Sequence, residues 1–246
     1  MTKLAILLVV GVIAMVYGDE PEPIVGGNMA SQGQFPHQIS LREDDYHICG
    51  GSIISSTHIL TAAHCITSPN IAPRLTVRTG TNNVKSGGQV HKVKCVQVHS
   101  GFDKYCLEND IALLTLASPI SFTSQQSAVP LASMDYANGQ NRAMISGWGQ
   151  LGKWSNMPTM LQYVDVTMLS HDACQKAHPD TSSKQICTFN SYGKGACMGD
   201  SGGPLIHNRE LVGVVSWGIP CAKGEPDVFT SVDYFRDWIK EHQQKC

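Results

Sequence analysis

The most constraining feature of the chain is its series of short strand-like segments, separated by glycine, proline, asparagine and serine. Apolar and polar side chains alternate over residues 162–169, which is the period of a strand with one buried face. Many short strands at regular spacing are typical of an antiparallel barrel or sandwich. We expect strands at 37–42, 52–55, 74–79, 90–98, 111–116, 143–146, 162–169, 211–217 and 228–232.

Helical periodicity is strong only near the C-terminus. Phe235, Trp238 and Ile239 would lie on one face of a helix that follows a candidate N-cap at Ser231. A shorter helix is expected to begin at Ser170. The pattern therefore predicts an all-β protein with few helices.

An apolar run at residues 4–16 predicts a secretory signal peptide, because it follows Lys3 and ends just before the small residue Gly18. A transmembrane anchor is the alternative, but the run is shorter than the roughly 20 apolar residues that a span needs. We expect residues 1–18 to be removed as a signal peptide and the rest to be a soluble, secreted, extracellular protein.

Charge and cysteine content exclude several partner classes. The 246 residues carry a net charge of −2, so there is no basic field for nucleic acid. A second long apolar run is absent from the sequence, so no membrane partner is expected. The nine cysteines of a secreted chain are expected to form disulfides rather than to bind metal.

Three motifs along the chain each contain one residue with catalytic potential. They are Thr-Ala-Ala-His-Cys at 61–65, Asn-Asp-Ile-Ala-Leu-Leu at 109–114 and Gly-Asp-Ser-Gly-Gly-Pro at 199–204. Each motif alone has a structural explanation, such as a turn or a buried histidine. Together they supply a serine hydroxyl, an imidazole base that activates it and a carboxylate that holds the imidazole tautomer.

With these motifs, residues 24–246 resemble the chymotrypsin/trypsin family of serine endopeptidases, of the chymotrypsin-like invertebrate type. The resemblance implies two six-stranded antiparallel β-barrels with a C-terminal helix and an active site between the barrels. It implies that His64 is the general base, Asp110 its orienting carboxylate and Ser201 the nucleophile. The backbone N–H groups of Gly199 and Ser201 would form the oxyanion hole.

The same resemblance locates the residues that would bind substrate. Ser216, Trp217 and Gly218 correspond to the strand that pairs with the substrate backbone. Gly195 stands where trypsin-like members carry an aspartate, and Asp227 stands on the facing wall, where glycine is usual. We expect a chymotrypsin-like preference for large apolar side chains, broadened by the Asp227 carboxylate. The specificity pocket would comprise Gly195, Ala196, Met198, Gly218 and Asp227.

Two other functions fit parts of the pattern. Residues 199–203 match the Gly-x-Ser-x-Gly pattern of α/β-hydrolases, but those enzymes place aspartate and histidine after the serine. Here the order His64, Asp110, Ser201 favours the chymotrypsin type. A catalytically silent homologue that acts as a secreted binding protein is the alternative outside enzymology, although such chains usually lose one of the three residues.

The cysteines fit the same resemblance. The resemblance implies three disulfide bridges, which leave three of the nine cysteines without a partner. Cys95 and Cys106 flank the loop before Asp110, so we expect a local bridge between them, with Cys246 left over. The alternative pairs Cys246 with Cys95 or Cys106. The bridges implied by the resemblance are Cys49–Cys65, Cys174–Cys187 and Cys197–Cys221.

In this family the chain is made as a zymogen, and cleavage before Ile24 would create an amino group that pairs with Asp200. Residues 19–23 would be the propeptide, and Pro23 stands where arginine or lysine is usual. We expect a dipeptidyl peptidase to remove Glu-Pro twice, over residues 20–23. A single cut after Pro23 by a proline-specific endopeptidase is the alternative.

Metals and cofactors are not expected to take part. The loop at 80–89 contains no carboxylate, whereas calcium needs several charged oxygen ligands. The expected partners are protein or peptide substrates and protein inhibitors of proteases, and the enzyme is expected to be a monomer. Digestion and venom are both open as its biological setting.

Overall fold

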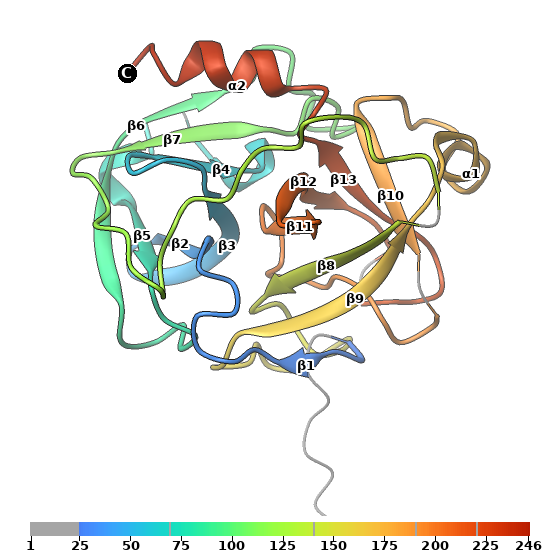
Figure 1. Ribbon diagram of the computed structural model, residues 1–246, viewed down its shortest axis with the longest axis horizontal. Helices are drawn as coiled ribbons and strands as arrows, with labels where there is room; N and C mark the ends of the chain where they lie inside the picture. The colour runs from blue at the N-terminus through green and yellow to red at the C-terminus, as the bar shows by residue number, and fades with distance from the viewer. Residues whose placement is uncertain (1–24, 69, 140, 190, 220) are drawn as a thin grey trace, which may run out of the picture.

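The computed structural model describes residues 25–68, 70–139, 141–189, 191–219 and 221–246 (Figure 1). The expected signal peptide (1–18), the expected propeptide (19–23) and Ile24 lie outside the described residues. Two barrels of strands lie side by side, and the segment that joins them crosses from one to the other (Figure 1).

The first barrel consists of six antiparallel strands and contains the N-terminal half of the described chain. Its strands are β2 (Gln38–Glu43), β3 (Tyr46–Ile53), β4 (His58–Thr61), β5 (Leu75–Thr79), β6 (Gln89–Val98) and β7 (Ala112–Leu116). They close in the order β2-β3-β4-β7-β6-β5, which leaves no free sheet edge. Ile39, Leu41 and Leu113 are fully buried inside it.

The second barrel is built in the same way. Its strands are β8 (Arg142–Gly147), β9 (Gln162–Met168), β10 (Gln185–Phe189), β11 (Pro204–His207), β12 (Glu210–Trp217) and β13 (Asp227–Ser231). They follow the order β9-β10-β13-β12-β11-β8, and pairing of β8 with β9 closes the barrel. A short strand, β1 (Asn28–Met29), adds to the side of β9. The expected architecture of two six-stranded barrels is confirmed.

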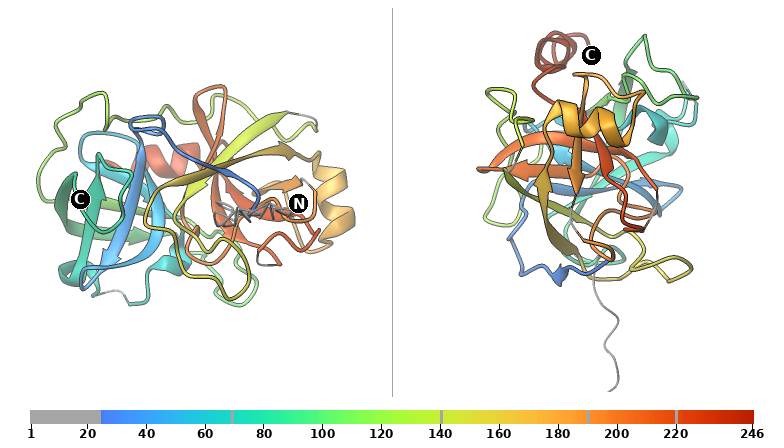
Figure 2. Two further views of the ribbon diagram at one scale, coloured as in Figure 1. Left: turned by 90° about the horizontal axis from the view of Figure 1, so that it is seen from below. Right: turned by 90° about the vertical axis from the view of Figure 1, so that its right-hand side faces the viewer.

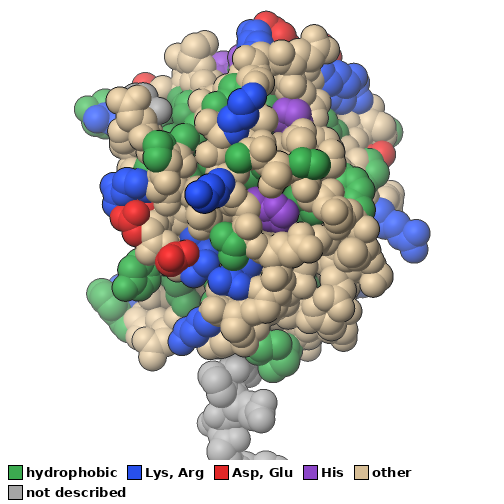
Figure 3. Space-filling view, turned by 90° about the vertical axis from the view of Figure 1, so that its left-hand side faces the viewer, with side chains coloured by type: hydrophobic (Ala, Val, Ile, Leu, Met, Phe, Trp, Pro, Cys, Tyr) green, Lys and Arg blue, Asp and Glu red, His purple; other side chains and the backbone are tan. Residues whose placement is uncertain are grey.

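Each of the nine expected strands overlaps one strand of the structure. Alternation of buried and exposed residues is seen on β5, β9 and part of β6, whereas β7 and β13 are short buried runs. On β6, Lys92 and Lys94 are exposed whereas His91 and Val93 are buried. Figure 3 looks onto this outer side of the first barrel, where Lys and Arg side chains are spread among polar and apolar ones. The strands β4, β10 and β11 were not expected. They are short and mostly buried, and without alternation a short apolar run does not distinguish a strand from another buried segment.

Both expected helices are present. Helix α1 (His171–Ala177) begins after Ser170, whose side chain accepts a hydrogen bond from the Ala173 backbone N–H at 3.2 Å. Helix α2 (Arg236–His242) begins later than expected, after Phe235, because Ser231 still belongs to β13. The expected N-cap at Ser231 is therefore wrong. Helix α1 lies on the outer side of the second barrel, and α2 lies over the first (Figures 1 and 2).

Three of the four expected disulfides are confirmed, and the fourth is wrong. Cys95 is bonded to Cys246 rather than to Cys106, and Cys106 is free and exposed. The packing of α2 over the first barrel brings the C-terminus to β6, where the Lys94 Nζ also donates to the Cys246 carbonyl at 2.7 Å. The bridge therefore fastens the last helix to the first barrel. The confirmed bridges are Cys49–Cys65, Cys174–Cys187 and Cys197–Cys221.

Among the described residues, none of the helices has the length and apolar character required to cross a membrane.

The disulfide pattern predicts unequal effects of two serine substitutions. Cys95→Ser opens the link between the first barrel and α2, so we expect it to lower the free energy of unfolding by about 2–4 kcal/mol. Cys106→Ser changes an exposed thiol and should shift that free energy by less than about 0.5 kcal/mol. Urea unfolding followed by fluorescence measures both. Equal destabilisation by the two variants, or alkylation of Cys246 in the native chain, would contradict the pairing.

Candidate active site

The carboxylate of Asp110 lies between the two barrels and is fully buried. From the first barrel, the His64 backbone N–H donates to its Oδ1 at 2.8 Å, and the His64 Nδ1 lies 2.7 Å from its Oδ2. From the second barrel, the Ser216 hydroxyl donates to Oδ2 at 2.6 Å. The Thr230 hydroxyl donates to the Asp110 carbonyl at 2.7 Å. Elements of both barrels therefore fix Asp110 and, through it, His64.

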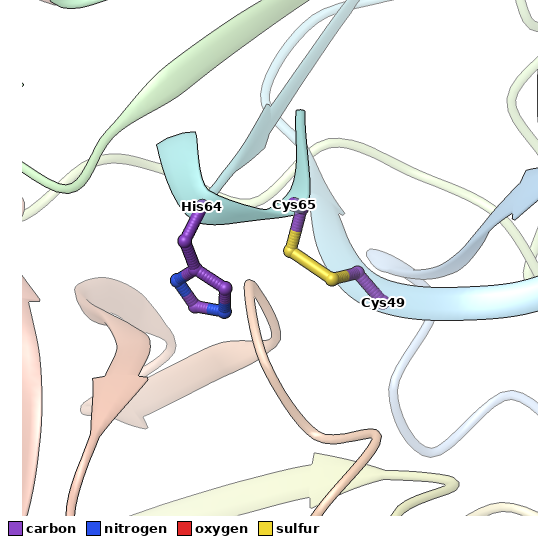
Figure 4. Close-up of side chains that lie close together, drawn as sticks. All are labelled: Cys49, His64 and Cys65. Atoms are coloured by element: carbon purple, nitrogen blue, oxygen red, sulfur yellow. A yellow bond between two sulfur atoms is a disulfide. The ribbon is translucent and has the colours of Figure 1, made fainter. Parts of the chain in front are cut away.

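The short 3-10 helix η1 (Ala63–Cys65) holds His64 at the end of β4. Its neighbour Cys65 is bonded to Cys49 on β3, and the His64 ring lies beside that bridge (Figure 4). Because a carboxylate only accepts hydrogen bonds, the Nδ1 of His64 carries the proton and its Nε2 lone pair is free in the neutral ring. The sulfurs of Cys49 and Cys65 are consumed by their bridge, so this cluster does not form a metal site.

Ser201 is placed next to this segment by its own backbone. The Gly50 N–H donates to the Ser201 carbonyl at 2.8 Å, which joins the serine turn to β3. A Cβ at Gly202 would lie 2.2 Å from the Thr61 Oγ1, so only glycine allows the turn to approach β4 this closely. Among the described contacts, the Ser201 hydroxyl makes no hydrogen bond to His64.

Two backbone N–H groups of the serine turn have no partner among the described residues. These are the N–H groups of Gly199 and Ser201. In contrast, the Asp200 N–H donates to Cys197 at 3.1 Å and the Gly202 N–H donates to Val215 at 2.8 Å. The unpartnered groups belong to residues that are partly exposed, so they can donate to a bound molecule.

The Asp200 side chain points away from solvent and is fully buried. It accepts hydrogen bonds from the Gly149 N–H at 2.8 Å and the Cys197 N–H at 3.0 Å. Burial raises the pKa of Asp200 to about 6, and these two N–H groups oppose that effect. The expected partner of this carboxylate, Ile24, lies outside the described residues.

A cavity of about 170 Å³ lies beside Ser201, and it contains most of the residues expected to form the specificity pocket. Gly195 does not line the cavity but adjoins it, because a Cβ there would lie 2.4 Å from the Asp227 Oδ2. The lining residues are Ala196, Cys197, Met198, Ser201, Val215, Ser216, Trp217, Gly218 and Asp227.

Among the described residues that line this cavity, Asp227 is the only acidic one. Its Oδ2 accepts a hydrogen bond from the Ala196 N–H at 2.8 Å. Burial, together with the nearby charge of Asp200, raises the pKa of Asp227 to about 7, and the Ala196 bond opposes this rise. The carboxyl group therefore changes its charge near neutral pH.

The expected substrate-binding strand borders the same cavity. The pairing of β12 with β13 is interrupted between Val215 and Trp217, so Ser216 has no partner residue in that ladder. The Trp217 ring packs edge-on against His178, with ring centroids 4.9 Å apart. This leaves an irregular strand edge beside Ser201.

Several residues that support the site were not identified from the sequence. Thr61, Gly149 and Thr230 contact residues distant in the chain, and although Thr61 lies in the motif at 61–65, that motif gave it no role. Ser216 was expected only as a substrate-binding residue, but its hydroxyl is directed at Asp110.

Comparisons with known proteins agree with this geometry. The family model described as Trypsin matches residues 24–239. Trypsin alpha of Drosophila erecta is 42% identical over 253 residues, covering 97% of each chain. Trypsin II-P29 of Gallus gallus is 40% identical over 236 residues, covering 93% of this chain and 92% of the relative. Chymotrypsin-2 of Vespa crabro is 37% identical over 220 residues, covering 89% of this chain and 100% of the relative.

The packing around Asp200 predicts that Gly149→Ala is strongly destabilising. Its Cβ would lie 2.3 Å from the Asp200 Oδ2 and would displace the carboxylate from its two N–H donors. We expect a loss of about 1.5–3 kcal/mol in the free energy of unfolding. Gly152→Ala is the matched control, because its Cβ would meet nothing within 4 Å. Thermal and urea unfolding measure both, and equal stability of the two variants would refute this packing argument.

Proposed function

The chain belongs to the trypsin family of serine endopeptidases, and on that premise we propose that it hydrolyses peptide bonds through Ser201, His64 and Asp110. The observation that carries this proposal is the 2.7 Å contact between the buried Asp110 Oδ2 and the His64 Nδ1. It fixes the tautomer in which the opposite ring nitrogen can accept a proton.

In the proposed reaction, the His64 Nε2 takes the proton of the Ser201 hydroxyl as the Ser201 Oγ attacks the substrate carbonyl carbon. The unpartnered N–H groups of Gly199 and Ser201 then bind the negatively charged oxygen. His64 gives its proton to the departing amine, which leaves an acyl group on Ser201. Water, deprotonated by His64, releases the acid and restores the serine. Asp110 stabilises the positive charge of His64 throughout.

The Ser201 hydroxyl and His64 are not hydrogen-bonded in the structure, and the proposal requires that they become so when substrate binds. Catalytic hydrogen bonds are often long before substrate is present, so this geometry is compatible with the mechanism. Substrate backbone would add to the irregular edge at Ser216, and protein inhibitors could occupy the same edge.

Turnover of peptide substrates by a purified chain that begins at Ile24 tests the activity. We expect Ser201→Ala and His64→Ala to reduce kcat/KM by at least roughly 1,000-fold, and Asp110→Asn to do so by a comparable factor. Circular dichroism controls for folding, because Asp110 also joins the barrels. Absence of turnover by the unsubstituted chain would favour the alternative of a catalytically silent binding protein.

For specificity, we propose a chymotrypsin-like preference for substrates with large apolar side chains, which the Asp227 carboxylate broadens to include basic side chains. The relatives carry both trypsin and chymotrypsin names, so the argument rests on the pocket. The described residues that line it are largely apolar and include one carboxyl group, that of Asp227. Gly195 leaves the space that the Asp227 Oδ2 occupies. Apolar side chains would contact the walls, and a basic side chain would reach the Asp227 carboxylate when it is ionised.

The raised pKa of Asp227 predicts a pH-dependent preference. Well below pH 7 the carboxyl group is neutral and apolar side chains should be favoured, whereas above pH 7 its charge should favour Arg and Lys. We expect the ratio of kcat/KM for an Arg substrate to that for a Phe substrate to rise roughly tenfold from about pH 5.5 to about pH 8.5. A pH effect on the catalytic step that is common to both substrates cancels in the ratio.

Asp227→Asn keeps the shape of the side chain but cannot ionise, so the ratio should become independent of pH and favour Phe. Asp172→Asn removes an equal charge from an exposed position and is the matched control. Exclusive cleavage after Arg and Lys at every pH, or an unchanged profile in Asp227→Asn, would reject the proposed role of Asp227.

For maturation, we propose that residues 1–18 direct secretion and that removal of residues 19–23 activates the enzyme. The new amino group of Ile24 would pair with the Asp200 carboxylate, which the described residues leave without a cation. Such a charge would lower the raised pKa of Asp200 and keep it ionised.

This proposal predicts that the active secreted protein begins with Ile24, as N-terminal sequencing and intact mass can show. Activity should fall as the new amino group loses its proton near about pH 8 or above. Pro21→Ser separates the two routes, because it should block stepwise removal of dipeptides but spare a single cut after Pro23. Full activity in a chain that still begins at Asp19 would exclude this activation mechanism.

A further inference from the structure

A second cavity, of about 490 Å³, shares no lining residue with the one beside Ser201. It forms where the segment before β2 and the connection between the barrels meet β8 and β11 (Figure 1). Its volume is in the range of small-molecule sites, roughly 300–1,000 Å³. Most of its wall is apolar, including Phe35, Val129, Pro130, Met144 and Ile206.

The imidazole of His37 forms part of this wall and is only 7% exposed. Its Nε2 is buried and has no hydrogen-bond partner among the described residues. Burial lowers the pKa of His37 to about 4, so the ring is neutral at pH 7. The His37 carbonyl accepts from the Ile53 N–H at 2.9 Å, which fixes the backbone in place. Buried polar side chains nearly always have a partner, and this one lacks it.

The charge at the cavity favours an anion. Arg209 lines it from the turn between β11 and β12, and this exposed side chain forms no ion pair or hydrogen bond within the described part of the chain. No Asp or Glu is among the described residues that line the cavity. An arginine without a carboxylate partner binds anions well because its planar guanidinium offers paired donors.

We infer that this cavity binds a small apolar carboxylic acid, with its carboxylate at Arg209, its apolar part against Phe35, Met144 and Ile206, and a hydrogen bond to the His37 ring. The ligands that would fit this site share an apolar body with one terminal carboxylate. The binding site is separate from the pocket beside Ser201, so the inference does not depend on the proposed proteolysis.

Octanoate is a suitable probe, and the chain carries an internal control for it. Met144 lines this cavity, whereas Met198 lines the pocket beside Ser201. In protein labelled with ¹³C at the methionine methyl groups, octanoate should shift the NMR signal of Met144 and leave that of Met198 unchanged. Octanamide has the same apolar part without the charge, and we expect it to bind at least roughly tenfold more weakly.

Two variants test the polar contacts. Arg209→Gln should weaken octanoate binding roughly tenfold and make it equal to that of octanamide, whereas Lys85→Gln, which removes an equal charge from another exposed loop, should not. His37→Leu should also weaken octanoate binding while keeping the fold, because it removes an unpaired polar atom. The inference would be overturned if the Met144 signal does not shift at about 1 mM octanoate, or if the Met198 signal shifts instead. It would also be overturned if Arg209→Gln binds octanoate as tightly as the unsubstituted chain does.

Discussion

The buried carboxylate of Asp110 is the interaction on which the rest of the site depends. It lies between the barrels and receives hydrogen bonds from His64 on one side and Ser216 on the other. A buried carboxylate is tolerated only where such donors replace water, and here the donors belong to different barrels. The packing of the two barrels therefore also fixes the orientation of the His64 ring.

The serine turn depends on the same arrangement. Its backbone is joined to the first barrel through Gly50 and to the second through Val215, so both barrels must be in place before Ser201 can stand beside His64. Glycine at position 202 is required by the close approach to Thr61. The turn also carries Asp200, whose burial raises its pKa, and a new amino group at Ile24 would remove much of that cost. The proposed activation by cleavage rests on this burial of Asp200.

The sequence predicted the strands and, through the family resemblance, the two barrels and the candidate catalytic residues, but not the long-range contacts. Alternating strands such as β6 and β9 were readable because one face is buried, whereas β4 and β11 lack that signal. Proximity along the chain suggested a Cys95–Cys106 bridge, but the packing of α2 determines that Cys246 is the partner. The cavity at His37 could not be predicted from the sequence either, because its wall combines segments far apart in the sequence.

We propose that His64, held by Asp110, activates Ser201 as a nucleophile. Treatment of the chain beginning at Ile24 with phenylmethanesulfonyl fluoride, followed by intact-mass and peptide mapping, tests this role of His64. We expect one adduct, located on Ser201, which forms in parallel with loss of activity and much more slowly in His64→Ala. An adduct on another residue, or labelling of Ser201 at the same rate without the His64 imidazole, would contradict it.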